Sequence, residues 1–382
     1  MIMMKQNRKT RWLFLLLALL LLTACSQTGG KPPLPEAAQD SYPFNQTAWE
    51  NYLTTESVVY HRNGAILTFR PSGDDRFYPL CGKPDCDHQS PDCNAWLGHG
   101  SGVGYWKGRL YAVTPSPENP GRMALLSMAP TGEDHRIELE LPTLTYADGS
   151  EGGASYYIFH ENRLICFLEP AADVPLEEQH PRLCVVALDT LAMTEPFSGW
   201  LDASQRVQMD AKAAGNCLYA RVEERSAQGS SEQWLCELNL DTGAKRRLVH
   251  SDGLFQWSVE NGVLYFLLPD VGFCEYELQT GSVRELGLPD PDLVWAVHTP
   301  QGSCAISRGE EDAKPQTCYF YDAQYRRQDQ LVLTQGLWPC YFDETRIWFA
   351  STLDPTDSAP VAYLERSRIG SGDLALTPCG AQ

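Results

Sequence analysis

Short apolar runs rich in β-branched and aromatic residues recur along this chain, and each one follows a tight-turn dipeptide. The turns are Asn63-Gly64, Lys107-Gly108, Glu161-Asn162, Gly215-Asn216, Asn261-Gly262, Gln301-Gly302 and Glu344-Thr345. The apolar runs that follow them span residues 65–69, 109–113, 164–168, 217–222, 263–268, 304–307 and 347–350. Successive turns are about 40 to 54 residues apart, which is the range of a four-stranded propeller blade. The pattern therefore predicts seven turn–strand repeats.

Many of these runs are apolar on both faces rather than alternating, as in Val-Leu-Tyr-Phe-Leu-Leu at residues 263–268. An antiparallel strand has this pattern when its sheet packs between two neighbouring sheets, as propeller blades do. No segment has a convincing 3.6-residue apolar period. The sequence therefore predicts an all-β fold, a β-propeller of seven four-stranded blades, with six or eight blades still open. Two β-sandwich domains are the alternative, although they would show a cleaner alternation.

The first twenty-five residues have the pattern of an export signal. Four basic residues and no acid accompany an apolar run at residues 12–22, which is shorter than the ~20 residues needed to span a bilayer. The next residues, Leu22-Thr23-Ala24-Cys25, resemble the lipobox of bacterial lipoproteins. The resemblance implies cleavage between Ala24 and Cys25, a diacylglycerol group on the Cys25 thiol, and usually a further acyl chain such as palmitate on the new amino terminus.

We expect three parts: a signal peptide at residues 1–24, a lipidated cysteine with a flexible tether at residues 25–41, and a propeller domain at residues 42–382. The chain has 30 basic and 49 acidic residues. Loss of the signal peptide removes four basic residues and leaves a net charge of about −23, which repels nucleic acid and anionic lipid headgroups. Nucleic acid is therefore not an expected partner, and the lipid has to hold the chain to the membrane.

The lipobox, the tether and repeats of the form N-G-x-L-Y-F … L-x-T-G, as at residues 261–281, together resemble bacterial surface lipoproteins with TolB-like or WD40-like propellers. The resemblance covers nearly the whole mature chain. It implies an extracytoplasmic protein, anchored to the bacterial cell membrane by the lipid on Cys25. Many of those families have no known function, so the resemblance names no ligand.

One segment differs from the repeats, because Cys81, Cys86, His88 and Cys93 fall within thirteen residues at the spacing C-x4-C-x-H-x4-C. Three thiolates and an imidazole suit tetrahedral zinc, and four protein ligands would make that zinc structural rather than catalytic. A disulfide between two of the cysteines is the alternative, since exported cysteines commonly oxidise. Reduced cysteines with no role are the third possibility. Because the spacing departs from the usual C-x2-C knuckle, it does not decide between a zinc site, a disulfide and reduced cysteines with no role.

Three repeats carry a cysteine on each of two successive strands: Cys166 with Cys184, Cys217 with Cys236, and Cys304 with Cys318. Folding each loop symmetrically places the two members of a pair opposite each other. A cross-strand disulfide would then close a loop of about 15 to 20 residues and stabilise the fold by ~3 kcal/mol. We favour the other interpretation, in which these cysteines are small apolar residues buried between blades.

The sequence contains no G-x-S-x-G elbow, H-E-x-x-H motif, P-loop or G-x-G-x-x-G motif, and we assign no catalytic residue. Four tryptophans lie near the first strand of their repeats: Trp106, Trp257, Trp295 and Trp338. They either stack on sugar rings or pack between blades, and we favour packing between blades. The expected function is non-catalytic binding of a protein or glycan. A glycan-active lyase or glycosidase and an envelope-assembly scaffold remain the alternatives, and structural zinc is the one cofactor considered.

Overall fold

The computed structural model describes residues 52–379 apart from 56, 101, 147, 153, 171–180, 198–203, 208–210, 227–229, 251–255, 269–270, 288–292, 300–301, 308–315, 334–335 and 352–358. The lipobox, Cys25, Ala24 and the tether therefore lie outside the described residues. Within the described part, no helix is long and apolar enough to cross a membrane.

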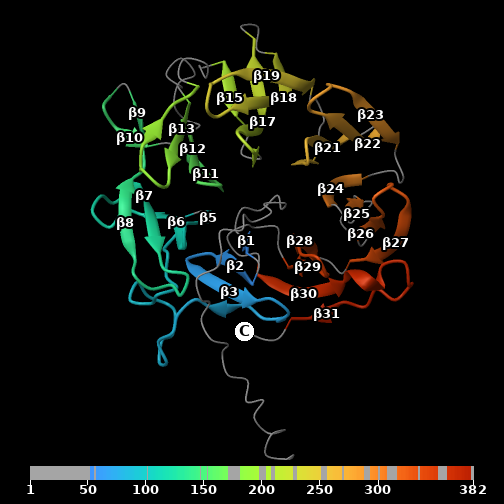
Figure 1. Cartoon of the computed structure of the whole chain (residues 1–382), viewed down its shortest axis with the longest axis horizontal. Helices are drawn as coiled ribbons and strands as arrows, with labels where there is room; N and C mark the ends of the chain where they lie inside the picture. The colour runs from blue at the N-terminus through green and yellow to red at the C-terminus, as the bar shows by residue number, and fades with distance from the viewer. Residues whose placement is uncertain are drawn as a thin grey trace, which may run out of the picture. The chain divides into compact units, whose positions relative to one another are not determined.

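The described chain folds into seven antiparallel sheets of four or five strands, which follow one another around a ring in sequence order, and one small two-stranded sheet (Figure 1). Blade 1 contains β1 (Tyr52–Thr54), β2 (Val58–Asn63), β3 (Ile66–Pro71) and β4 (Tyr78–Pro79). Blade 2 contains β5 (Val103–Trp106), β6 (Arg109–Pro115), β7 (Met123–Met128) and β8 (Arg136–Glu140). A small hairpin, β9 (Leu144–Thr145) with β10 (Glu151–Gly152), leads to blade 3, which contains β11 (Ala154–His160), β12 (Arg163–Glu169), β13 (Arg182–Ala187) and β14 (Met193–Thr194).

Blade 4 contains β15 (Gln205–Val207), β16 (Lys212–Ala214), β17 (Cys217–Arg225), β18 (Ser231–Asn239) and β19 (Lys245–His250), and both β15 and β16 pair with β17. Blade 5 contains β20 (Gln256–Glu260), β21 (Val263–Leu268), β22 (Gly272–Glu277) and β23 (Val283–Gly287). Blade 6 contains β24 (Leu293–Thr299), β25 (Gly302–Ser307), β26 (Thr317–Tyr321) and β27 (Arg327–Val332). Blade 7 contains β28 (Trp338–Phe342), β29 (Arg346–Ala350), β30 (Pro360–Glu365), the 3-10 helix η2 (Arg366–Arg368) and β31 (Thr377–Pro378).

The architecture confirms the predicted seven-bladed propeller, with one difference in blade 1. In blades 2 to 7 the predicted turn joins the first and second strands, as Asn261-Gly262 joins β20 to β21. In blade 1, Asn63-Gly64 instead joins the second strand to the third. The difference arises because β1 is only three residues long and precedes the first recognisable repeat, so its pattern is too short to detect.

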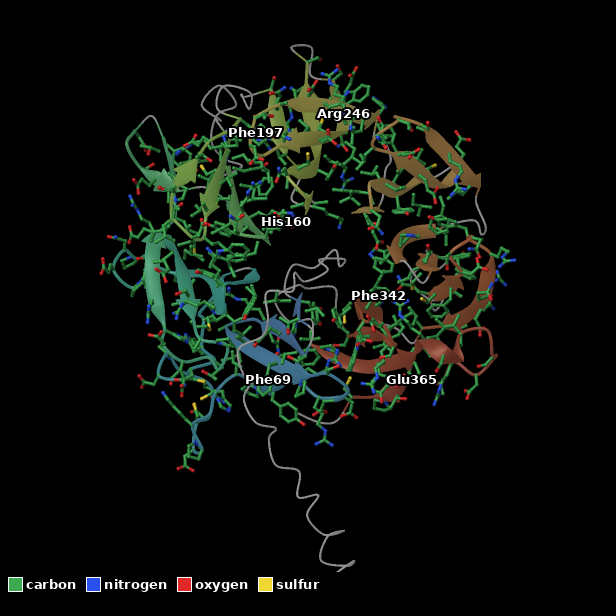
Figure 2. The ribbon with its side chains drawn as sticks, in the orientation of Figure 1. Phe69, His160, Phe197, Arg246, Phe342 and Glu365 are labelled. Atoms are coloured by element: carbon green, nitrogen blue, oxygen red, sulfur yellow. The ribbon has the colours of Figure 1, made fainter. Side chains whose placement is uncertain are left out.

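Apolar clusters lie between successive blades and explain why the strands are apolar on both faces. On β12, Ile165 and Phe167 join a cluster shared with blade 4, whereas Leu164 and Leu168 join one shared with blade 2. Phe197 belongs to the first of these clusters and lies between blades 3 and 4 (Figure 2). Alternate residues of one strand therefore bury against different neighbouring sheets.

The four tryptophans near the first strands also lie at these boundaries between blades. Trp257 and Trp295 are buried within the clusters, and Trp106 and Trp338 pack against them half-buried. This placement supports the interpretation of packing between blades over that of sugar-stacking platforms.

Blades 7 and 1 share no strand in the described part of the chain. Side-chain contacts therefore hold these two sheets together. The Arg70 guanidinium lies 3.0 Å from the Asp343 carboxylate and stacks 4.4 Å above the Trp348 ring. Tyr52 stacks on Tyr341 with ring centroids 4.8 Å apart. The ring is thus closed at this boundary by a buried ion pair and aromatic contacts.

Candidate metal centre

The segment with the cysteines and histidine is an insertion in the outermost strand of blade 1. The chain leaves the outer edge of the sheet just after β4, at Leu80, whose N–H donates to the carbonyl of Leu67 in β3 at 2.9 Å. It returns at Ala95, whose carbonyl accepts from the Leu67 N–H at 2.8 Å. Residues 95–97 then continue beside β3, with Trp96 opposite Ile66. Both ends of the excursion at residues 81–94 therefore meet the same residue of β3, and we call this excursion the Cys/His loop.

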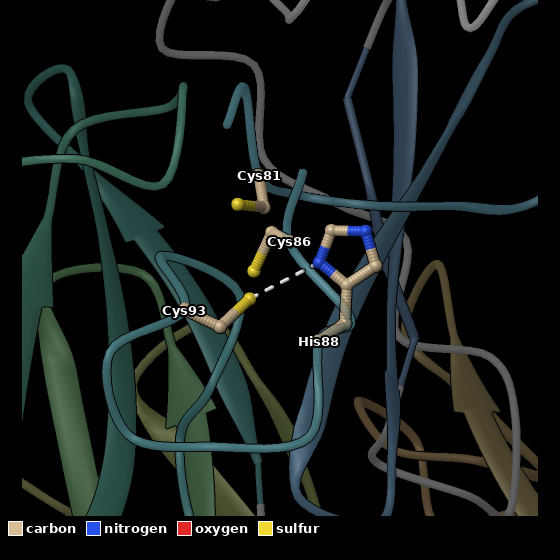
Figure 3. A group of neighbouring side chains, drawn as sticks. All are labelled: Cys81, Cys86, His88 and Cys93. Atoms are coloured by element: carbon tan, nitrogen blue, oxygen red, sulfur yellow. Dashed lines mark hydrogen bonds between the residues drawn. The ribbon is translucent and has the colours of Figure 1, made fainter. Parts of the chain in front are cut away.

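The structure brings the four predicted ligands together in the Cys/His loop (Figure 3). The Sγ atoms of Cys81, Cys86 and Cys93 and a ring nitrogen of His88 all lie within 4.8 Å of one another. The His88 Nδ1 atom is 3.2 Å from Cys93 Sγ. Cys81 and Cys93 are buried where the loop begins and ends, while Cys86 and His88 are half-buried.

Backbone conformation and N–H groups orient these donors. His88 has a positive φ of 59°, which is uncommon for a residue with a side chain. The Ala95 N–H donates to Cys93 Sγ at 3.3 Å, and the N–H groups of Lys83 and Asn94 donate to Cys81. Such N–H···S bonds stabilise thiolates and fix the direction of the sulfur lone pairs.

The two buried cysteines differ in their pKa. Burial raises the pKa of the Cys93 thiol to about 12. Burial also opposes ionisation of Cys81, but the backbone N–H groups outweigh it and bring the Cys81 pKa below its ordinary value. In the absence of a cation, therefore, Cys81 ionises first and Cys93 keeps its proton at neutral pH.

Blade 2 supports the Cys/His loop from the side. The turn at Gly132 approaches Leu80 so closely that a Cβ atom on Gly132 would lie 2.3 Å from the Leu80 carbonyl oxygen. His135 Nε2 lies 3.0 Å from the Asn94 carbonyl oxygen. The loop is thus held between its own sheet and the neighbouring blade.

A buried arginine fixes the chain just after the Cys/His loop. Arg62, 1% exposed, donates to the carbonyl oxygens of Gly98 at 2.8 Å, Val113 at 2.6 Å and Gly64 at 3.3 Å. These carbonyls satisfy a guanidinium whose pKa burial lowers to about 10. Sequence reasoning did not identify Arg62, because a single arginine before a turn has no distinctive pattern.

The arrangement can do one of two things chemically. Four soft donors converging on one point can hold a metal ion with every position taken by protein, which gives a structural site with no place for a substrate. Alternatively, two of the three sulfurs can form a disulfide. In the structure, the twelve cysteines of the described part are all free thiols.

The structure also tests the geometry of the three other cysteine pairs. Cys166 lies directly opposite Cys184, as predicted. Cys304 is offset by two residues from Cys318, although their Sγ atoms are 3.0 Å apart.

The predicted pairing of Cys217 with Cys236 is wrong, since Cys217 lies opposite Asn239 and Cys236 lies opposite Ala220. The hairpin closes between Ser226 and Ser230, and the register is shifted by three residues from one that would place these two cysteines opposite each other. The shift is odd, so the two cysteines face different blades.

Comparisons with known proteins do not assign this chain to a family. No family model matches the chain, and no curated protein matches it. Among solved structures, BamB from Moraxella catarrhalis is 12% identical, covering 90% of this chain and 89% of that one, with a TM-score of 0.42. An oligogalacturonate lyase from Vibrio parahaemolyticus is 11% identical, covering 71% and 74%, with a TM-score of 0.44. The computationally designed Ika8 protein is 11% identical, covering 82% and 96%, with a TM-score of 0.44.

Proposed function

We propose that this chain is an extracytoplasmic lipoprotein, anchored to the bacterial cell membrane through Cys25, whose β-propeller binds a protein or glycan without chemistry. The export signal and lipobox at residues 1–25 support the location. The net negative charge supports a lipid rather than an electrostatic attachment to the membrane.

One observation carries the non-catalytic part of the proposal. The group of metal-ligating side chains found among the described residues is a closed set of four protein donors on the outermost strand of blade 1. A catalytic metal needs an open coordination position, and four protein donors in a tetrahedral set leave none. The remaining blades present loops around one ring, which suits recognition of a ligand.

Anchoring is tested by labelling the full chain with a palmitate analogue in a bacterial host. The Cys25→Ser variant should lose the label and leave the membrane fraction, whereas Cys274→Ser, which changes a buried thiol in β22, should retain both. Label on the Cys25→Ser variant would contradict lipidation at this residue.

Binding is tested with the full lipidated chain in detergent, immobilised through its C-terminus and exposed to glycan arrays and to purified envelope proteins. A saturable ligand recovered chemically unchanged supports the binding module. Release of unsaturated sugars or new reducing ends would instead favour a propeller lyase or glycosidase. Stoichiometric recovery of envelope-assembly proteins alone would favour the scaffold.

A further inference from the structure

We infer that the Cys/His loop binds one Zn²⁺ ion through Cys81 Sγ, Cys86 Sγ, His88 Nδ1 and Cys93 Sγ, and that this ion fastens the interrupted outer strand of blade 1. The inference concerns the loop alone and does not depend on the lipid anchor or on the ligand of the propeller.

The distances among the donors fit a tetrahedral site. Zn–S bonds of about 2.3 Å and Zn–N bonds of about 2.0 Å place the ligand atoms of a tetrahedron roughly 3.5 to 3.8 Å apart. The four donor atoms of the loop all lie within 4.8 Å of one another, and the His88–Cys93 pair is at 3.2 Å. Small rotations about the side-chain bonds therefore suffice to place all four on one ion.

The histidine distinguishes a metal from a disulfide. A disulfide joins two of the sulfurs and involves neither the third cysteine nor His88. His88 instead adopts the left-handed conformation, which is unfavourable for a residue with a side chain, and its ring nitrogen Nδ1 lies 3.2 Å from Cys93 Sγ. A single ion can bind all four side chains at once, and three thiolates with one imidazole select zinc over harder cations.

The position of the loop explains what the ion does. Residues 82–85, 87, 89, 91 and 92 are exposed, so the loop has almost no apolar core of its own. Ordering each residue of the loop costs backbone conformational entropy, which a loop with so little apolar burial has to offset in another way. Cys81 directly follows Leu80 and Cys93 lies two residues before Ala95, so an ion bound to both joins the two halves of the strand where they meet Leu67.

Backbone groups around the donors complete the site. The N–H groups of Lys83, Asn94 and Ala95 point at the sulfurs of Cys81 and Cys93. The Lys83 ammonium donates to the Asp92 carbonyl across the loop. These contacts orient the ligands from outside, as is usual for structural metal sites.

The primary experiment measures the metal content of the full chain, purified without chelator, by mass spectrometry. We expect one zinc per chain in the wild type and in Cys274→Ser, the buried-thiol control, and at least a tenfold lower content in Cys86→Ser and His88→Gln. Equal zinc in all four proteins would overturn the inference, as would a zinc-free wild type whose loop peptides are joined by a disulfide.

A second measurement keeps the test decisive if Cys86→Ser does not fold. Wild-type chain stripped by a chelator is titrated with Co²⁺, which should give intense thiolate-to-cobalt absorption saturating at one equivalent. Zinc should also slow cleavage by endoproteinase Asp-N before Asp85, Asp87 and Asp92 at least tenfold relative to the stripped chain. Absence of the cobalt bands, or equal cleavage with and without zinc, would refute the site.

Discussion

The ion pair between Arg70 and Asp343 is expected to control the closure of the ring between blades 1 and 7. Arg70 is 3% exposed, and the side chain of Asp343 is 16% exposed. The Asp343 carboxylate also accepts from Trp348 Nε1 at 2.8 Å, from the Thr345 N–H at 2.9 Å and from the Arg346 N–H at 2.7 Å. Arg70→Met would keep most of the side-chain volume and leave this carboxylate without its cation.

The expected loss of stability in Arg70→Met follows from the burial of the Arg70–Asp343 ion pair. Removing one partner of a buried ion pair typically costs about 3–5 kcal/mol, because the remaining charge loses its counterion in a low dielectric. The stacking of Arg70 on Trp348 adds on the order of 1–2 kcal/mol. The four donors that remain on Asp343, which include the Thr345 hydroxyl, reduce the loss, so we expect Arg70→Met to lower the free energy of unfolding by about 3–4 kcal/mol.

Urea denaturation of the full chain, followed by tryptophan fluorescence, measures this loss at pH 7. Asp343→Asn and the double variant complete a cycle, in which we expect a coupling of about 2 kcal/mol because each single change strands the other partner. Arg284→Met is the matched control. Arg284 pairs with Glu275 but its side chain is 67% exposed, so its removal should cost less than about 1 kcal/mol.

The pH dependence has a defined sign. Burial opposes ionisation of Asp343, but the donated hydrogen bonds and Arg70 outweigh it and lower the Asp343 pKa. The stabilisation from Asp343 is therefore present above the ordinary pKa of an aspartate, about 4, and is lost as the pH falls through the lower pKa of the folded state. A cost for Arg70→Met no larger than for Arg284→Met, or additive single changes in the cycle, would refute the role of this pair.

Three further predictions concern blades 1 and 2. Burial lowers the pKa of His61 to about 3, and its ring nitrogens have no hydrogen-bond partner among the described residues. The folded state therefore loses stability as the pH falls below about 6.5, the ordinary pKa of histidine. Urea titrations at pH 7 and pH 4 should show that His61→Phe removes roughly 2–4 kcal/mol of this loss. Gly132→Ala should lower the free energy of unfolding by about 2–4 kcal/mol, because the added Cβ would meet the Leu80 carbonyl. Gly121 also has a positive φ but faces open space, so Gly121→Ala should lower it by only about 1 kcal/mol. Equal shifts in the melting temperature of the two variants would contradict the contact. Arg62→Met should cost about 3–5 kcal/mol by leaving buried carbonyls unsatisfied, and a loss below 1 kcal/mol in urea denaturation would contradict that account.

The candidate site could be predicted from the sequence because its residues are local. Cys81 to Cys93 lie within one loop, so spacing alone brings unusual side chains together whatever the rest of the chain does. The supports of this loop could not be predicted in the same way. Gly132 approaches Leu80, just before the loop, from another blade, and Arg62 binds Gly98, just after the loop, from another strand. Nothing in the local sequence around Gly132 or Arg62 indicates which carbonyl each will meet. The blade 7 to blade 1 contacts are equally distant, since Arg70 and Asp343 are far apart in sequence.

The cysteine pairs show the same limit within a single hairpin. Apolar periodicity identifies both strands, but the register depends on where the turn closes, and that is decided by a few residues of loop. For Cys166 and Cys184 the closure is symmetric and the cysteines face each other. For Cys217 and Cys236 a shift of three positions turns the side chains toward different blades, where Cys236 joins the apolar cluster with blade 3 and Cys217 packs toward blade 5. A cysteine count cannot therefore separate a disulfide from two unrelated buried thiols in this fold. The Cys/His loop differs from these pairs, because its four donors lie within thirteen residues of one loop and their side chains converge there.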